Sequence, residues 1–217
     1  MTLELPLTRN VRTDLSPTDL QAYEANGGYR ALRMALADKS PGDCLQIIKD
    51  SNLKGRGGAG FPTGMKWSFV PMDDAAAPAG GNGHKYLICN ADEMEPGTFK
   101  DRLLLECDPH QLIEGMILSA YTIGADIAYI FIRAEYHKAT SLLRQALADC
   151  YAKGYLGDNI LGSGYRLDMY VHSSAGRYIC GEETALISSL EGKRANPWAK
   201  PPFPQVSGLW GRPTIVN

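Results

Sequence analysis

The amino-acid sequence predicts an α/β fold of three layers, in which a mostly parallel sheet carries helices on both faces. Segments of strand-like composition alternate three times with segments whose apolar residues recur at the helical period. Parallel strands need a crossover between them, and a helix that packs back onto the sheet provides it. The chain has 217 residues, of which 44% are hydrophobic and 21% charged, and it is therefore large enough to bury a substantial core.

Three segments are expected to form the strands of this sheet. Residues 86–89 and 127–132 are short apolar runs, which is typical of strands buried on both faces. In the third segment Leu167, Met169 and Val171 alternate with polar or aromatic side chains, which is the pattern of a strand.

Four segments are expected to be helical. The first, at residues 40–48, opens with a serine N-cap, a proline at the first helical position and an acid three residues after the cap. The second begins at Asp108-Pro109 and continues to Tyr121 with apolar residues at helical spacing. The third carries an apolar face formed by Tyr136, Ala139, Leu143, Ala146 and Cys150, and the fourth covers residues 182–191.

The chain divides into three predicted parts. Residues 1–53 form an N-terminal helical segment, residues 54–195 the α/β domain, and residues 196–217 a proline-rich irregular segment without a strand or helix. Residues 75–83 are expected to form a flexible surface loop. Because the chain stops without a capping signal, we expect it to be a fragment that leads into a missing C-terminal region.

The glycine-rich segment at residues 55–64 is the strongest local signal for a ligand. Its glycines include a G-x-G-x-x-G pattern, but residues 44–49, before it, look helical, whereas a standard Rossmann site requires a strand there. We therefore expect a Rossmann-like fold with a non-standard glycine-rich loop preceded by a helix. Bare main chain lets N–H groups approach a flat or phosphorylated ligand, and Lys66, Phe61, Trp67 and Phe69 nearby suit a nucleotide. The alternative is a tight loop that binds nothing.

Polar side chains follow the predicted strands where each strand ends. Asp92, Glu93 and Glu95 come after the first strand, and further loops cover residues 133–136 and 173–183. In open α/β sheets, ligands bind beyond the carboxyl ends of the strands. These acids therefore favour a site for ligand hydroxyls or cationic groups, with a solvated acidic turn as the alternative.

Composition excludes several other functions. The net charge of −2 gives no electrostatic footprint for nucleic acid. The 4 histidines and 5 cysteines are scattered without ligand spacing, so no metal site is expected, and Cys180 is interpreted as a packing residue. No secretory signal is visible, and the apolar runs are far shorter than the ~20 residues that span a bilayer, so we expect a cytoplasmic protein.

Four long motifs resemble one protein family. They are KGRGGAGFPTGMKWSF at residues 54–69, CNADEMEPGTFKDR at 89–102, SAGRYICGEETALISSLEGKRANPWAKPPFP at 174–204 and GLWGRPTIVN at 208–217. Together they resemble the N-terminal FMN-binding portion of the flavin-bearing NADH dehydrogenase subunit, the F subunit, of respiratory complex I (NADH:quinone oxidoreductase). Similar domains occur in the diaphorase subunits of NAD-reducing hydrogenases and formate dehydrogenases.

The resemblance implies roles for individual residues, with Glu183 and Tyr178 at the catalytic position and Glu183 ordering the nicotinamide. A carboxylate at Glu95 would discriminate NADH from NADPH. The residues expected to line FMN are Gly55, Gly57, Lys66, Asn90, Asp92, Glu93, Tyr178, Gly181, Glu182 and Asn217. The residues expected to surround NADH are Gly58, Ala59, Phe61, Phe69, Glu95, Glu183, Lys200 and Phe203, with the phenylalanines stacked on the adenine.

The resemblance also implies a place in electron transfer. NADH would pass hydride to bound FMN, which would feed iron–sulfur clusters and quinone. The expected partners are NADH and other peripheral-arm subunits, among them a thioredoxin-like [2Fe–2S] subunit, so that the chain lies at the inner face of the cell membrane only indirectly.

A [4Fe–4S] cluster is expected only in the missing C-terminal region. Without that region, we expect residues 194–217 to be loose, FMN to bind weakly and electrons not to pass onward. The alternatives are a diaphorase subunit of a hydrogenase or formate dehydrogenase, and a truncated nucleotide-binding fragment without turnover.

Overall fold

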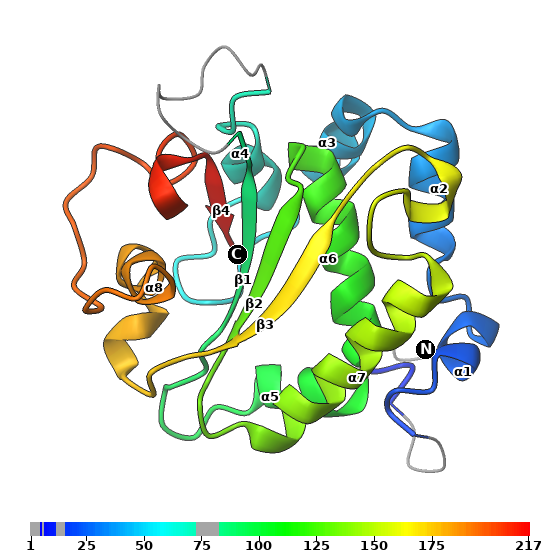
Figure 1. The fold of residues 1–217 in the computed structure, drawn as a ribbon, viewed down its shortest axis with the longest axis horizontal. Helices are drawn as coiled ribbons and strands as arrows, with labels where there is room; N and C mark the ends of the chain where they lie inside the picture. The colour runs from blue at the N-terminus through cyan, green and yellow to red at the C-terminus, as the bar shows by residue number, and fades with distance from the viewer. Residues whose placement is uncertain (1–4, 6, 12–15, 73–82) are drawn as a thin grey trace.

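A four-stranded parallel sheet forms the centre of the molecule (Figure 1). The computed structural model describes residues 5, 7–11, 16–72 and 83–217. The strands lie in the order β3-β2-β1-β4, and each neighbouring pair is parallel. Their bounds are β1 Tyr86–Ala91, β2 Ile127–Ile132, β3 Asp168–Ser173 and β4 Thr214–Val216. The predicted parallel sheet is thus confirmed, and its three expected strands lie next to one another.

The fourth strand corrects the prediction that no regular element follows Asn196. In β4, Thr214, Ile215 and Val216 are buried and pair with β1 in register from Tyr86 onward. The expectation that residues 194–217 are loose is therefore wrong for this strand and for Leu209, which is fully buried before it. Three residues after Pro213 are too few to show an alternating pattern, and only the partner strand makes them a strand.

The two faces of the sheet pack into separate apolar clusters, because side chains alternate along a strand. Leu87, Ala128 and Ile130 pack into the larger cluster with α6 and α7. Ile88 and Phe131 pack on the opposite side with α8. Figure 1 shows these helices on opposite faces, which confirms the predicted three layers.

Eight α-helices and three short 3₁₀ helices are assigned in the described ranges. The α-helices are α1 Leu20–Ala25, α2 Arg30–Asp38, α3 Pro41–Asp50, α4 Thr63–Trp67, α5 Lys100–Cys107, α6 Pro109–Ile123, α7 His137–Lys153 and α8 Glu183–Leu190. The 3₁₀ helices are η2 Ile160–Gly162, η3 Tyr178–Gly181 and η4 Leu209–Gly211. None of the helices in this part of the chain is long and apolar enough to cross a bilayer.

The predicted helix starts are confirmed by their caps. Ser40 and Asp43 form a reciprocal capping box at α3, and the Asp108 side chain accepts from the Gln111 amide at the start of α6. Glu182 is the N-cap of α8 rather than its first residue. Helix α5 was not expected from the sequence. The predicted surface loop at residues 75–83 lies outside the described residues except for Gly83.

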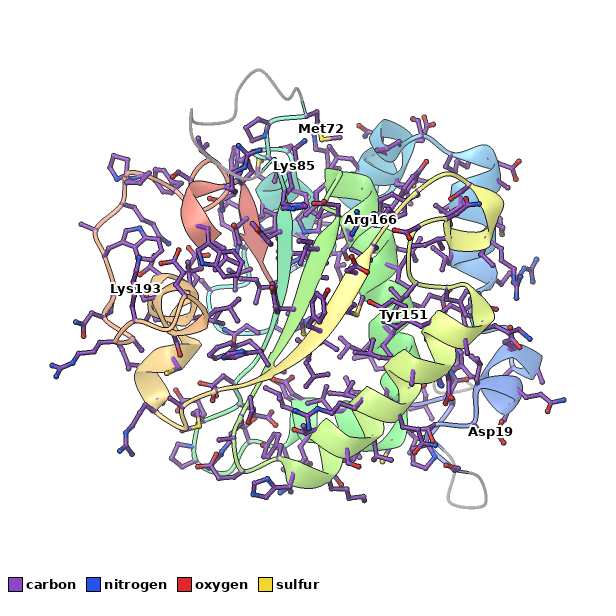
Figure 2. The ribbon with its side chains drawn as sticks, viewed as in Figure 1. Asp19, Met72, Lys85, Tyr151, Arg166 and Lys193 are labelled. Carbon is purple, nitrogen blue, oxygen red and sulfur yellow. The ribbon has the colours of Figure 1, made fainter. Side chains whose placement is uncertain are left out.

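One edge of the sheet is protected by a side chain of α7. β3 lies at the end of the strand order, and the Met169 amide donates to the Tyr151 hydroxyl at 2.9 Å. Figure 2 shows Tyr151 beside this strand, with Arg166 just before the strand begins. An edge strand whose main-chain groups are already bonded is a poor template for pairing with another chain.

Candidate functional site

The carboxyl ends of all four strands meet at one edge of the sheet, where side chains tie the loops together. The Asn90 side-chain amide donates to the Gly181 carbonyl at 2.8 Å, and the Ser174 hydroxyl donates to Asp92 Oδ1 at 2.8 Å. The Asn217 amide donates to the Ile88 carbonyl, while the Asn217 carbonyl accepts from the Asn90 amide. The loops after β1 and β3 are therefore held against each other at the end of β4.

Asp92 contributes an unsatisfied acceptor at this edge. Its side chain is buried, and Oδ2 has no hydrogen-bond partner among the described residues. Burial raises the pKa of the Asp92 carboxyl, although the hydrogen bond from Ser174 and the charge of Arg133 oppose the shift. A buried polar atom without a partner is costly, so such an atom indicates a place where a ligand donor fits.

Glu93 has a different environment from Asp92, although the two are adjacent. Its carboxylate accepts from the Asp101 and Arg102 amides at 2.9 and 3.0 Å, and from the hydroxyls of Thr98 and Tyr136 at 3.1 and 3.0 Å. Burial raises the pKa of Glu93, but these four donors outweigh it and hold the pKa below its ordinary value. Glu93 therefore caps α5 and fixes the loop after β1 to the loop after β2.

Glu182 is also bonded within the protein. One oxygen of its carboxylate accepts from the Thr184 and Ala185 amides at 2.9 and 2.8 Å and from the Thr184 hydroxyl at 2.6 Å. The side chain thus stabilises the first turn of α8. The main chain beside it, at Gly181, faces the loop after β1, because a Cβ at Gly181 would lie 3.7 Å from the Asp92 carbonyl oxygen.

The glycine-rich loop is a narrow hairpin with an exposed tip. An antiparallel bridge joins Lys54 to Pro62, and the Gly55 amide donates to the Phe61 carbonyl at 3.0 Å. Residues 56–60 donate no main-chain hydrogen bond to any described residue. Gly58 and Gly60 have φ angles of 147° and 66°, which L side chains rarely adopt. The tip therefore presents free N–H groups on a backbone that requires glycine.

Lys66 connects this loop to the strand-end edge. Its ammonium donates to the Val216 carbonyl and to Glu183 Oε2, the latter at 3.3 Å, and the Lys200 ammonium contacts Glu183 Oε1. Helix α4, which directly follows the glycine-rich loop, thus lies against the end of β4 and the start of α8. As Figure 1 shows, the glycine-rich loop lies on the side of β1 that faces α8. Two regions that the sequence analysis singled out separately are therefore neighbours.

The two lysines control the ionisation of Glu183. Burial raises the pKa of its carboxyl, but Lys200 and Lys66 together outweigh that effect, so the pKa lies below its ordinary value. The group is therefore ionised at neutral pH. Its charge orders both lysines, whose remaining N–H donors are available for an anionic ligand.

We expect Glu183→Gln to lower the free energy of unfolding by about 1 kcal/mol at pH 7, because it removes the charge that both lysines contact. A folded-state pKa below the unfolded value near 4.5 gives stabilisation that is complete above that value and disappears as the pH falls through the folded pKa. Urea unfolding from pH 7 to pH 3 measures this. The two proteins should converge in acid, and a difference that stays constant to pH 3 would contradict the assignment.

The remaining predicted residues lie on the exposed rim. The Tyr178 hydroxyl donates to Glu95 Oε1 at 2.5 Å, so the loops after β1 and β3 meet here as well. Phe61, Phe69 and Phe203 are each about half exposed, at 49%, 52% and 54%. Ala59 is exposed in the glycine-rich tip. Such aromatic side chains offer flat apolar surface to a ligand.

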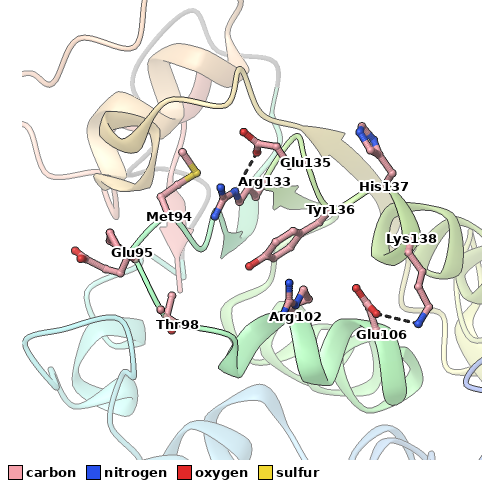
Figure 3. Close-up of a pocket in the computed structure, with 12 residues that line it drawn as sticks. Met94, Glu95, Thr98, Arg102, Glu106, Arg133, Glu135, Tyr136, His137 and Lys138 are labelled. Carbon is pink, nitrogen blue, oxygen red and sulfur yellow. Dashed lines mark hydrogen bonds and ion pairs between the residues drawn. The ribbon is translucent and has the colours of Figure 1, made fainter.

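A cavity that the sequence analysis did not predict lies beside this rim. It has a volume of about 620 Å³, and the loops after β1 and β2 and the helices that follow them form its walls (Figure 3). Charged side chains dominate the lining. The residues around the cavity are Met94, Glu95, Pro96, Gly97, Thr98, Arg102, Glu106, Arg133, Glu135, Tyr136, His137 and Lys138. Their common signal in the sequence is position, since they follow two adjacent parallel strands.

Comparison with known proteins confirms the resemblance. Residues 48–217 match the family model described as the Nuo51 FMN-binding domain. A NADH-quinone oxidoreductase F subunit of Rhizobium meliloti (strain 1021), the one numbered 2, is 59% identical over 198 residues, which are 91% of this chain and 45% of that protein. The NADH-quinone oxidoreductase F subunit of Escherichia coli (strain K12) is 54% identical over 212 residues, 98% of this chain and 46% of that protein.

Solved structures agree with the sequence relatives. The NAD⁺-reducing [NiFe]-hydrogenase in its air-oxidised state matches with a TM-score of 0.73 and 39% identity over 99% of this chain and 32% of that chain. The same enzyme in its H₂-reduced state matches with a TM-score of 0.71 and 38% identity. The chain spans about half the length of the curated relatives it matches. It belongs to the Nuo51 FMN-binding domain family.

Proposed function

We propose that this chain binds FMN and NADH and supports hydride transfer between them, as the flavin-binding part of an NADH dehydrogenase of the F-subunit type. The observation that carries the proposal is the contact of Lys66 with Glu183 and the Val216 carbonyl. It brings a loop with free N–H donors to the strand-end edge, where open α/β sheets bind their ligands. The family and the names of the relatives support the same function.

The residues present fit FMN. The phosphate suits the free N–H groups of residues 56–60 and the ammonium of Lys66. A Cβ built at Gly57, Gly58 or Gly60 meets nothing within 4 Å, so the loop is open on the side that a cofactor would approach. The orphaned Asp92 oxygen can accept a hydrogen bond from a cofactor hydroxyl or N–H. Donors and acceptors thus match both ends of such a molecule.

The role of this chain in the reaction is to bind and orient. Bound FMN supplies the hydride-accepting chemistry, and hydride transfer requires little acid–base help from protein groups. Glu183 holds Lys66 and Lys200 in place, and we propose that its carboxylate also orders the nicotinamide. Tyr178, fixed by Glu95, stands at the rim between the two ligands. Phe61, Phe69 and Phe203 would stack on the adenine and exclude water from the flavin.

The main test is flavin binding and turnover by the 217-residue chain. We expect added FMN to lose fluorescence on binding, and the mixture to reduce ferricyanide with NADH. Ferricyanide accepts electrons from the flavin directly, so the assay needs no further cluster. FMN binding without NADH oxidation would favour a non-catalytic nucleotide-binding fragment, and the absence of both would overturn the proposal.

We expect Glu95→Gln to raise the rate with NADPH relative to NADH severalfold, up to about tenfold, because a 2′-phosphate beside a carboxylate suffers like-charge repulsion. The ratio of kcat/KM for the two substrates measures this. Asp38→Asn on α2 removes an exposed charge far from the rim and serves as the control. An unchanged ratio in Glu95→Gln would remove Glu95 from substrate selection.

The setting of the reaction is a second proposal. The relatives named as F subunits of NADH-quinone oxidoreductase favour respiratory complex I, with other peripheral-arm subunits as partners and a place at the inner face of the cell membrane. The match to an NAD⁺-reducing hydrogenase favours a diaphorase instead. Co-purification separates the two settings, because a thioredoxin-like [2Fe–2S] subunit with quinone-reducing partners supports the first, and hydrogenase subunits support the second.

A further inference from the structure

The cavity beside the rim contains an aromatic ring between two guanidinium groups. The guanidinium carbons of Arg102 and Arg133 lie 5.9 and 5.5 Å from the centre of the Tyr136 ring. Figure 3 shows the ring between the two arginines, with both guanidinium groups toward the interior of the cavity. The Tyr136 hydroxyl is fixed by Glu93, so the ring is a rigid support for both cations.

The charges around the cavity are paired except for one. Glu106 pairs with Lys138 at 2.9 Å, Glu135 pairs with Arg133 at 3.0 Å, and Glu95 accepts from Tyr178. Arg102 has no carboxylate partner among the described residues. Its five N–H donors are therefore directed at open space beside a ring that already holds the guanidinium in place.

The two ion pairs that line the cavity can be exchanged at little cost. The Glu135 side chain is 54% exposed and stands two residues from Arg133, and the Lys138 side chain is 70% exposed. Exposed pairs of this kind contribute about 0–1 kcal/mol. An anion that enters the cavity can therefore take Arg133 from Glu135 and contact Lys138 without a large penalty.

We propose that this cavity binds a phosphate monoester, with Arg102 as the principal contact and Arg133 as the second. Planar guanidinium groups match phosphate oxygens bidentately, and a phosphate monoester brings about −1.5 to −2 charges to a wall that holds three cationic side chains. A metal cation is disfavoured because Glu106 and Glu135 already neutralise lysine and arginine. The phosphate could be free or attached to a nucleoside, since the recognition chemistry is the same.

The test is a titration of the 217-residue chain without FMN or NADH, so that its outcome is independent of the proposed flavin function. Inorganic phosphate, 2′-AMP and 5′-AMP are titrated separately and followed by calorimetry. We expect saturable binding that Arg102→Met weakens by roughly tenfold or more, since hydrogen bonds to charged groups are among the strongest single contacts. Equal affinity for the three probes identifies recognition of the phosphate alone, whereas tighter binding of one nucleotide identifies the attached nucleoside as well.

Arg144→Met is the matched control. Arg144 is exposed on α7, outside the residues that line the cavity, and its replacement changes net charge by the same amount. Circular dichroism and thermal unfolding establish that both variants are folded, and Arg102→Lys tests whether charge without the planar fork suffices. The absence of saturable binding, or an equal effect of Arg102→Met and Arg144→Met, would overturn the proposal.

Discussion

Replacing Lys66 by Met is expected to weaken FMN binding by roughly tenfold to a hundredfold, and to lower NADH–ferricyanide activity in proportion at limiting FMN. The ammonium touches both Glu183 and the Val216 carbonyl, so its loss separates the glycine-rich loop from the strand-end edge. Methionine keeps the apolar stem, and the change therefore removes charge more than packing. Quenching of flavin fluorescence in a titration measures the affinity.

Two variants make the Lys66 result interpretable. Lys39→Met removes an exposed lysine beyond the end of α2 and should leave FMN affinity unchanged. Lys66→Arg keeps the charge and should recover part of the affinity. If Lys66→Met binds FMN as tightly as the parent chain, the glycine-rich loop does not carry the phosphate.

Replacing Gly64 by Ala is expected to lower the unfolding temperature by roughly 2 to 12 °C. A Cβ at this position would lie 2.8 Å from the main-chain nitrogen and 2.9 Å from the Cα of Lys49 on α3. Overpacking against backbone that cannot move away costs about 1–3 kcal/mol, and for a chain of this size each kcal/mol corresponds to about 2–4 °C. Calorimetric or circular-dichroism melting measures the shift.

Gly57→Ala is the control within the same glycine-rich segment. A Cβ at Gly57 meets nothing within 4 Å, and its φ is not in the left-handed region. The melting temperature should therefore stay unchanged, although we expect FMN to bind less tightly. A melting temperature of Gly64→Ala equal to that of Gly57→Ala would show that α3 and α4 can separate without loss.

The elements that could be predicted are those whose signals lie within a few residues of each other. The capping box of Ser40 and Asp43, and Asp108 before Pro109, are local and were found. Helix α5 has no side-chain cap at its own N-cap, Phe99, because Glu93 bonds its first amides from eight and nine residues away. β4 is defined by pairing with β1, more than a hundred residues earlier. Neither signal is visible in a local window.

The candidate site was predicted by composition and by resemblance, but its connections were not. The sequence shows that Lys66 and Glu183 are charged, whereas only the fold brings them to 3.3 Å of each other. Adjacent acids gave no sign that Asp92 keeps an unsatisfied oxygen while Glu93 is fully bonded. The cavity around Tyr136 requires two loops from neighbouring strands, and its lining was therefore outside the reach of motifs.

The position of β4 sets the order in which this molecule can be assembled during synthesis. β1 lies in the middle of the chain and forms an inner strand of the sheet, yet one of its two neighbours consists of residues 214–216. The carbonyl that receives Lys66 belongs to the same late segment. A nascent chain on the ribosome therefore has an open edge at β1 until residue 216 has emerged, and contacts this distant in sequence close slowly. Premature termination before that point would leave a strand able to pair with other chains, and would remove the lysine's anchor in the same event.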